Sequence, residues 1–248
     1  MRKISVFFAL IALFALLSAE PSFGQWFIDL ENGAALPGYN DVQIPRDTGT
    51  LFSLSEDLKA EAAYFFRIRL GVQWKNRHTI SAFVAPFRLR AAGSVDREID
   101  FFDETFSPGA ALTGVYKFNS YRLTYRYDIV RKGRWWAGIG LTAKIRDAAV
   151  KIEGEGKTSN KTNVGFVPLL NFRVLWQFHE NWGLLLDGDA AAAKQGRAED
   201  VALALQYRVN QRLSLRAGYR ILEGGADVEE VYNFALVHFL GVGLTYTF

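Results

Sequence analysis

The feature that most constrains the fold of this chain is a two-residue alternation of apolar and polar side chains. In the clearest example, Phe66 and Ile68 fall on one face, and Arg67 and Arg69 fall on the other. Successive side chains of a strand point to opposite faces, so this period predicts β-structure. The pattern covers residues 60–74, which is long for a strand of a globular protein and suits a tilted membrane span.

Nine further segments repeat the alternation, and the connections between them are short and long in turn. The pattern predicts ten strands, with eight or twelve as alternatives, near residues 26–35, 60–74, 79–92, 121–129, 135–146, 164–178, 182–190, 201–209, 213–221 and 233–248. Short turns are expected after the even-numbered strands, and mostly long loops after the odd-numbered ones, including 147–162, 194–200 and 224–232. No apolar run beyond the first 24 residues approaches the length of a membrane-spanning helix.

The polar faces of these segments predict a charged interior. In the third segment, the apolar residues Phe83, Phe87 and Leu89 are expected to face outward. The residues expected to line the lumen are Arg67, Arg69, Arg88, Arg90, Arg122, Arg126, Asp128, Lys144, Arg146, Arg173, Asp187, Asp189, Arg208, Arg216 and Arg220, with Asp29 and Glu31 on the same face. Basic residues dominate this set, while many other acids fall in the loops, so the sequence predicts a strongly cationic lumen.

Aromatic residues mark one end of the segments. Trp26, Trp74, Trp135 and Trp182 all fall where a segment meets a short turn, and Phe248 ends the chain. Amphipathic aromatic rings are enriched where a membrane meets water. We therefore expect these five residues to form an aromatic girdle at that end.

The amino terminus has the layout of a cleaved leader. Two basic residues precede the apolar run 4–17, and Ser22 and Gly24 are small residues before a predicted cleavage site. The expected organisation is a signal peptide over residues 1–24 and one β-domain over 25–248. Cleavage removes two positive charges and one negative charge, which lowers the formal net charge from +3 to about +2. A nearly balanced charge argues against nucleic acid as a partner.

The last strand carries a resemblance to a known family. Leu244, Tyr246 and Phe248 alternate with Gly243 and Thr245 up to the final aromatic residue. This ending resembles the closing strand of bacterial outer-membrane β-barrels, in which the last aromatic residue forms part of the assembly signal. The resemblance implies an all-β, transmembrane, antiparallel up-and-down barrel in the outer membrane. It also implies contact with outer-membrane lipid and lipopolysaccharide, and with the barrel-assembly machinery through this strand.

The sequence leaves two classes of function open. In the first, arginines and carboxylates fill the lumen as ion pairs, and the loops act as a structural or surface-binding element. In the second, the arginines line a narrow channel or a pocket for small anionic solutes. The segment Asn40–Thr50 contains several turn-forming residues, and we expect it to fold over or into the mouth of the barrel, or to present a binding surface.

No enzyme is expected, and an outer-leaflet hydrolase is a distant third alternative. His78 and His179 fall in predicted turns, and the spacing of Asp227 and His238 does not reproduce the motif of the ten-stranded omptin proteases. The absence of cysteine excludes disulfides and thiol nucleophiles. No metal-ligand spacing occurs, so no metal or cofactor is expected.

Overall fold

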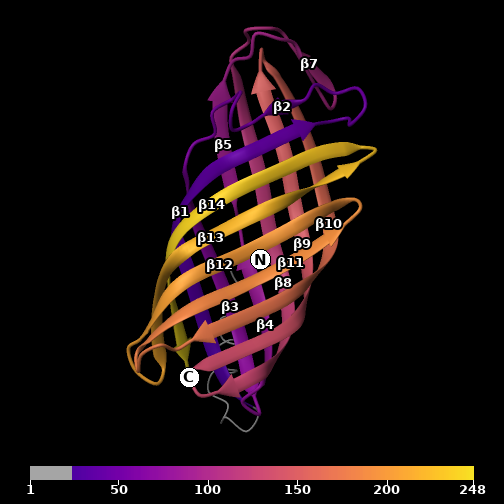
Figure 1. Cartoon of the computed structure of the whole chain (residues 1–248). Helices are drawn as coiled ribbons and strands as arrows, with labels where there is room; N and C mark the ends of the chain where they lie inside the picture. Colours follow the sequence, from indigo (N-terminus) through magenta and orange to yellow (C-terminus); the bar gives the residue numbers. More distant parts are fainter. Residues whose placement is uncertain (1–23) are drawn as a thin grey trace, which may run out of the picture.

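The computed structural model describes residues 24–248, so the expected signal peptide lies outside the described residues except for its last residue. The chain forms a closed antiparallel barrel of ten strands, in which β4 and β5 together make one strand, interrupted at residues 86–87 (Figure 1). The strands are β1 (Gln25–Gln43), β3 (Ala63–Trp74), β4 (His78–Ala85), β5 (Arg88–Gly93), β8 (Leu112–Lys132), β9 (Trp135–Gly154), β10 (Lys157–Trp176), β11 (Trp182–Ala193), β12 (Gly196–Arg208), β13 (Leu213–Val228) and β14 (Val231–Thr247).

The first and last strands close the barrel. β1 pairs with β14 from Phe27, opposite Thr247, to Gln43, opposite Tyr232, with one irregularity between Pro37 and Asn40. Closure pairs the backbone groups of both edge strands, which a membrane-spanning sheet requires. The prediction of a ten-stranded, antiparallel, transmembrane barrel is confirmed. Within residues 24–248 no helix is long and apolar enough to cross a membrane.

The two ends of the barrel differ. Connections 75–77, 133–134, 177–181 and 209–212 are short, and we call this the turn end. At the opposite end, the two long connections 44–62 and 94–111 form what we call the cap. The cap contains the short strands β2 (Phe52–Ser53), β6 (Ile99–Phe101) and β7 (Glu104–Phe106). Figure 1 shows β2 and β7 at one end of the elongated barrel and the C-terminus near the other.

The strands rise further at the cap end than the sequence predicts. The predicted loops 147–162, 194–200 and 224–232 are largely strand, and their hairpins turn at 155–156, 194–195 and 229–230. These segments are polar because they extend beyond the apolar outer surface of the barrel into water. Their backbone is nevertheless paired as strand. Similarly, Asn40–Gln43 belong to β1 rather than to a loop.

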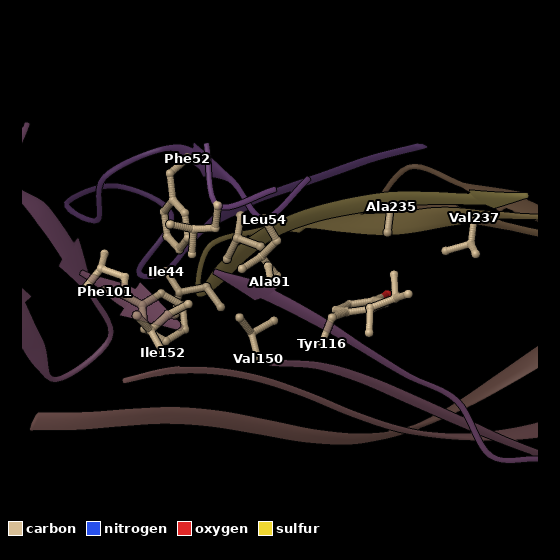
Figure 2. Packing of buried hydrophobic residues seen from close by; sticks show 14 of the residues in the cluster. Ile44, Phe52, Leu54, Ala91, Phe101, Tyr116, Val150, Ile152, Ala235 and Val237 are labelled. Carbon is tan, nitrogen blue, oxygen red and sulfur yellow. The ribbon is translucent and has the colours of Figure 1, made fainter. Parts of the chain in front are cut away.

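An apolar core lies inside the cap end of the barrel. Its side chains come from the cap, including Phe52, Leu54 and Phe101, and from the inner wall, including Tyr116 and Ile152. Figure 2 shows these side chains packed between the cap and the strands. The connection that follows Gln43 thus folds into the mouth, where Ile44 and Leu58 are buried.

The third barrel strand differs in parity from the prediction. Phe83, Phe87 and Leu89 are buried inside the barrel, whereas Arg88 and Arg90 are exposed on its outer surface. The predicted parity holds only if the interior is polar along the whole strand. At this height the interior is apolar, so the large apolar residues face inward and the arginines face water.

Candidate functional site

Charged side chains from seven strands meet in the interior, on the turn side of the apolar core. Asp200 of β12 lies at the centre and is 2% exposed. Both of its carboxylate oxygens accept bonds from Arg67 Nη1 at 3.1 Å, Arg122 Nη2 reaches Oδ2 at 2.5 Å, and Arg220 Nη1 reaches Oδ1 at 2.6 Å. One buried carboxylate therefore joins arginines of β3, β8 and β13.

A second group of contacts joins β13 to β1 and β14. Glu31 accepts two bonds from Arg220, both at 2.8 Å, and one from Arg216 at 3.0 Å. Arg216 also donates to both oxygens of Asp29, at 2.5 and 3.0 Å, and Thr245 Oγ1 donates to the same carboxylate at 2.6 Å. Paired, fork-shaped contacts of this kind are the strongest arginine–carboxylate geometry. They tie the closing seam of the barrel to the central group.

A third group of contacts extends across β8 to β11. Arg122 Nη1 lies 2.7 Å from Asp189, whose other oxygen accepts bonds from Thr142 at 2.6 Å and Asn171 at 2.9 Å. Asp187 pairs with Arg69 at 3.4 Å and with Arg173 at 3.3 Å. Nearer the turn end, Arg126 lies 3.5 Å from Asp128.

These groups form what we call the ionic layer, which is close to neutral. It contains seven arginines (Arg67, Arg69, Arg122, Arg126, Arg173, Arg216 and Arg220) and six carboxylates (Asp29, Glu31, Asp128, Asp187, Asp189 and Asp200). The formal sum is +1, in contrast to the strongly cationic lumen expected from the sequence. Leaving a buried charge unpaired is costly, and each arginine of this layer has a carboxylate partner.

Aromatic rings separate the ionic layer from the apolar core. Arg67 lies 4.7 Å from the ring centre of Phe239, and Arg122 lies 4.9 Å from that of Phe83. Phe239 in turn contacts the rings of Phe65 and Phe87 at 4.9 and 5.3 Å. The rings accept the guanidinium groups on one side and apolar side chains on the other. Ionic layer, aromatic rings and apolar core therefore follow one another along the barrel axis.

The other residues predicted to line the lumen lie elsewhere. Arg88 and Arg90 are on the outer surface, and Arg208 is half-buried near the turn end. Lys144 and Arg146 of β9 face inward beside a separate pocket. Within residues 24–248, neither of them forms a salt bridge.

The predicted girdle residues lie near the turn end. Trp135 stacks on Trp176 with ring centres 5.6 Å apart, and Trp182 contacts Tyr207 at 4.7 Å. Trp74 stacks on His78 at 5.2 Å. The backbone N–H of Phe248 donates to the carbonyl of Trp26 at 2.9 Å, which fixes the last residue against the first strand.

His78 and His238 contact aromatic side chains. His78 Nδ1 lies 2.9 Å from the Tyr125 hydroxyl, and His238 contacts Tyr219. Asp227 binds Arg46 at 2.7 Å. Ile221 lies opposite His238, and Asp227 lies six residues further along β13, which places it about 20 Å from His238. Among residues 24–248, no group of three or more His, Cys, Asp or Glu is placed to hold a metal ion.

Sequence reasoning missed the central residue of the ionic layer. The polar run from Lys194 to Asp200 predicts a loop, yet β12 begins at Gly196 and includes Asp200. Asp200 shares parity with Ala202, Ala204 and Gln206, all on the inner face. Extending the alternation of the eighth segment upward by one pair of residues would have identified it.

Comparison with solved structures places this fold among bacterial outer-membrane barrels. The outer membrane protease OmpT from Escherichia coli aligns with a TM-score of 0.55 and 10% identity, covering 92% of this chain and 97% of that chain. Ail of Yersinia pestis, solved with the heparin analogue sucrose octasulfate, has a TM-score of 0.41 and 10% identity, covering 90% and 99%. Neisserial surface protein A has a TM-score of 0.38 and 15% identity, covering 90% and 97%. The sequence matches no protein-family model and no curated protein.

Proposed function

We propose that this bacterial outer-membrane β-barrel is closed to ions and acts as a structural or surface-binding protein through its cap. The observation that carries the proposal is the filling of the interior at successive heights. The ionic layer consists of mutually paired charges, and the apolar core lies above it. An ion crossing the barrel would have to break the ion pairs of the ionic layer, and a ten-stranded barrel is little wider than one filled by its own side chains.

The cap supports a binding role because it is an ordered surface. The backbone N–H of Phe102 donates to the Ile44 carbonyl at 2.7 Å. Between the two long connections, the backbone N–H of Thr50 donates to the Asp100 carbonyl at 2.8 Å, and the backbone N–H of Asp100 donates to the Thr50 hydroxyl at 2.9 Å. The Ser159 hydroxyl of β10 donates to the Phe101 carbonyl at 3.0 Å. A surface held in this way is already organised for recognition, which lowers the entropic cost of binding a partner.

The exposed residues of the cap also suit an interface. Leu51 and Phe102 are large apolar residues with 52% and 42% exposure. Arg97 and Asp57 form an exposed ion pair at 2.9 Å beside them. Apolar anchors rimmed by polar groups are common at protein interfaces. The proteolytic activity named for OmpT is not carried over, since at 10% identity only the fold is shared.

The channel alternative is tested by single-channel conductance of the refolded chain, residues 25–248, in a planar bilayer with a salt gradient. We expect a heat-modifiable, β-rich barrel that shows no discrete openings. As a positive control, the double variant Arg122→Ala and Arg220→Ala removes two guanidinium groups from the ionic layer and should increase current if it still folds. Discrete, anion-selective openings of the unaltered chain would overturn the proposal and favour a channel for small anions.

The binding role needs a second measurement. Intact cells that display the unaltered chain should bind surface material of the host or of neighbouring cells more strongly than cells displaying Leu51→Asp, Phe102→Asp. Arg88→Gln is the matched control, because it changes an exposed residue outside the cap. Equal binding by all three would contradict a role for the cap.

A further inference from the structure

The wall of the barrel is interrupted between β10 and β11. β10 pairs with β9 along its whole length, from Lys157 to Trp176. With β11 it pairs only from Leu170, opposite Ala190, to Trp176, opposite Leu184. Residues 157–169 of β10 therefore have no strand partner on their β11 side among the described residues. β11 itself ends at Ala193, while β9 and β10 continue to a hairpin at 155–156.

The sequence explains where the pairing stops. Continuing the register from Leu170 and Ala190 would place Pro168 opposite Ala192. Proline has no backbone N–H and is therefore confined to sheet edges or irregularities. Opposite it, residues 190–193 are all alanine, with side chains too small to fill the space. Pro168 and the alanine run thus produce an opening that a continuous ladder would not have.

A pocket of about 550 Å³ lies behind this opening. Its wall includes inward residues such as Tyr116 and Val150 as well as Phe166 and Pro168 on the outer side of β10. The pocket therefore extends through the wall of the barrel. β13 and β14 contribute apolar side chains to the wall, including Leu222, Ala235 and Val237, while Glu223, Glu230 and Asn233 also border the pocket. This volume falls in the range of sites for small organic ligands.

Basic side chains line the β9–β10 side of the pocket. Lys144 lies opposite Val167, Arg146 opposite Gly165, and Lys161 opposite Val150. Lys144 is 2% exposed, and its ammonium group lies 4.7 Å from the ring centre of Phe118, with no carboxylate in contact. The Nε of Arg146 is buried and has no hydrogen-bond partner among the described residues. Lys161 pairs with Glu230 at 3.9 Å, and Arg146 Nη2 donates to the amide oxygen of Asn163 at 2.5 Å. Among the described residues, Lys144 and Arg146 are therefore cations of the pocket without a carboxylate partner.

The opening lies at the upper border of the apolar outer surface. Phe166 and Val164 of β10 are 64% and 70% exposed, and the next outward residues, Thr162 and Asn160, are polar. On β9 the outward apolar series likewise ends at Ile145, before Asp147. In a membrane, this border is where acyl chains meet headgroups. A molecule could therefore pass between the outer leaflet and the pocket without crossing the ionic layer.

We propose that this pocket binds a single-chain anionic amphiphile that enters sideways between β10 and β11. Its carboxylate or phosphate headgroup lies against Lys144 and Arg146. Its acyl chain lies along the apolar wall of β13 and β14 and leads out through the opening. The site lies apart from the ionic layer and from the exposed surface of the cap, although Ile44 of the cap and Tyr116 of the apolar core line it. Binding at this site does not depend on the proposed function.

The test uses the refolded chain, residues 25–248, in neutral detergent micelles, with a fluorescent long-chain fatty acid as the probe. Lys144→Met keeps the length and apolar stem of the side chain and removes the charge; we expect it to weaken binding about tenfold or more. Arg146→Gln should weaken it less. Ala192→Trp, which places a large ring in the opening, should slow association strongly. Arg90→Gln is the matched control, since it removes an exposed cation from the outer surface.

Competition identifies the headgroup. A fatty acid and a lysophosphatidic acid of equal chain length should both displace the probe, and the tighter one identifies carboxylate or phosphate as the preferred anion. The fatty alcohol of that length should bind weakly, and equally well to the unaltered chain and to Lys144→Met. Absence of saturable binding, or equal binding by the unaltered chain, Lys144→Met and Ala192→Trp, would overturn the proposal. Heat modifiability checks that each variant has folded.

Discussion

The ionic layer and the apolar core fill the same tube by opposite means. The ionic layer is built from the barrel wall alone, by charged side chains from strands far apart in sequence, such as Glu31 and Arg220. The apolar core also needs the cap, because Phe52, Leu54 and Phe101 come from the long connections. A tube can therefore be closed by the pairing of wall charges or by a loop folded inward. Only the first of these is visible as alternation in the sequence.

The largest loss of stability should follow the removal of one charge from the ionic layer. Asp200→Asn leaves Arg67, Arg122 and Arg220 without their shared carboxylate and should destabilise the barrel by about 3–5 kcal/mol. Urea titration of the protein in lipid vesicles measures the change. Asp96→Asn, in the exposed part of the cap, is the control and should not shift the midpoint. An unchanged midpoint for Asp200→Asn would show that the ionic layer contributes no stability.

Truncating a side chain of the apolar core should reduce stability somewhat less than removing the charge of Asp200. Ile152 is fully buried under the cap, and Ile152→Ala should destabilise by about 2–4 kcal/mol through lost transfer energy and a cavity. In the double variant with Asp200→Asn, the two losses of unfolding free energy should add to within about 0.5 kcal/mol, because residues without shared partners act independently. A larger coupling energy would mean that the layers form one cooperative unit.

The outward arginines sharpen the comparison between interior and surface. Arg90→Gln should change stability by no more than about 0.5 kcal/mol, as expected for an exposed site away from special contacts. The same substitution at Arg122 should resemble Asp200→Asn in size. Equal losses at both positions would place Arg90 inside the barrel, as the sequence alone suggested.

The smallest expected effect concerns the attachment of the cap. The backbone N–H of Ser107 donates to Glu155 Oε2 at 2.9 Å and holds the pKa of that carboxyl below its ordinary value of 4.5. A carboxyl whose pKa is lower in the folded state stabilises that state above the ordinary value. This contribution is lost as pH falls through the lower folded-state pKa. The amide shift of Ser107 in NMR spectra should titrate in that range and become flat in Glu155→Gln.

Much of the barrel could be predicted from alternation, and its failures share a cause. Strand identity, the closing strand and inward residues such as Arg67 and Arg122 depend on local parity, which a sequence displays. The parity of Arg88 and the role of Asp200 depend on how high the strand runs and on what fills the interior at that height. Both follow from loops folding back over long sequence distances, which no local pattern records. The opening beside Pro168 likewise depends on register between two hairpins.

The central claim is that the interior is closed at the ionic layer, and the absence of native cysteine makes it directly measurable. Ala204 faces the ionic layer from β12 and is 6% exposed, whereas Leu51 is 52% exposed on the cap. A small water-soluble thiol reagent should modify Leu51→Cys in folded, vesicle-embedded protein. It should leave Ala204→Cys unreacted from either side of the membrane until the barrel is unfolded. Modification of Ala204→Cys at a rate close to that of Leu51→Cys would contradict closure and reveal a water-filled passage.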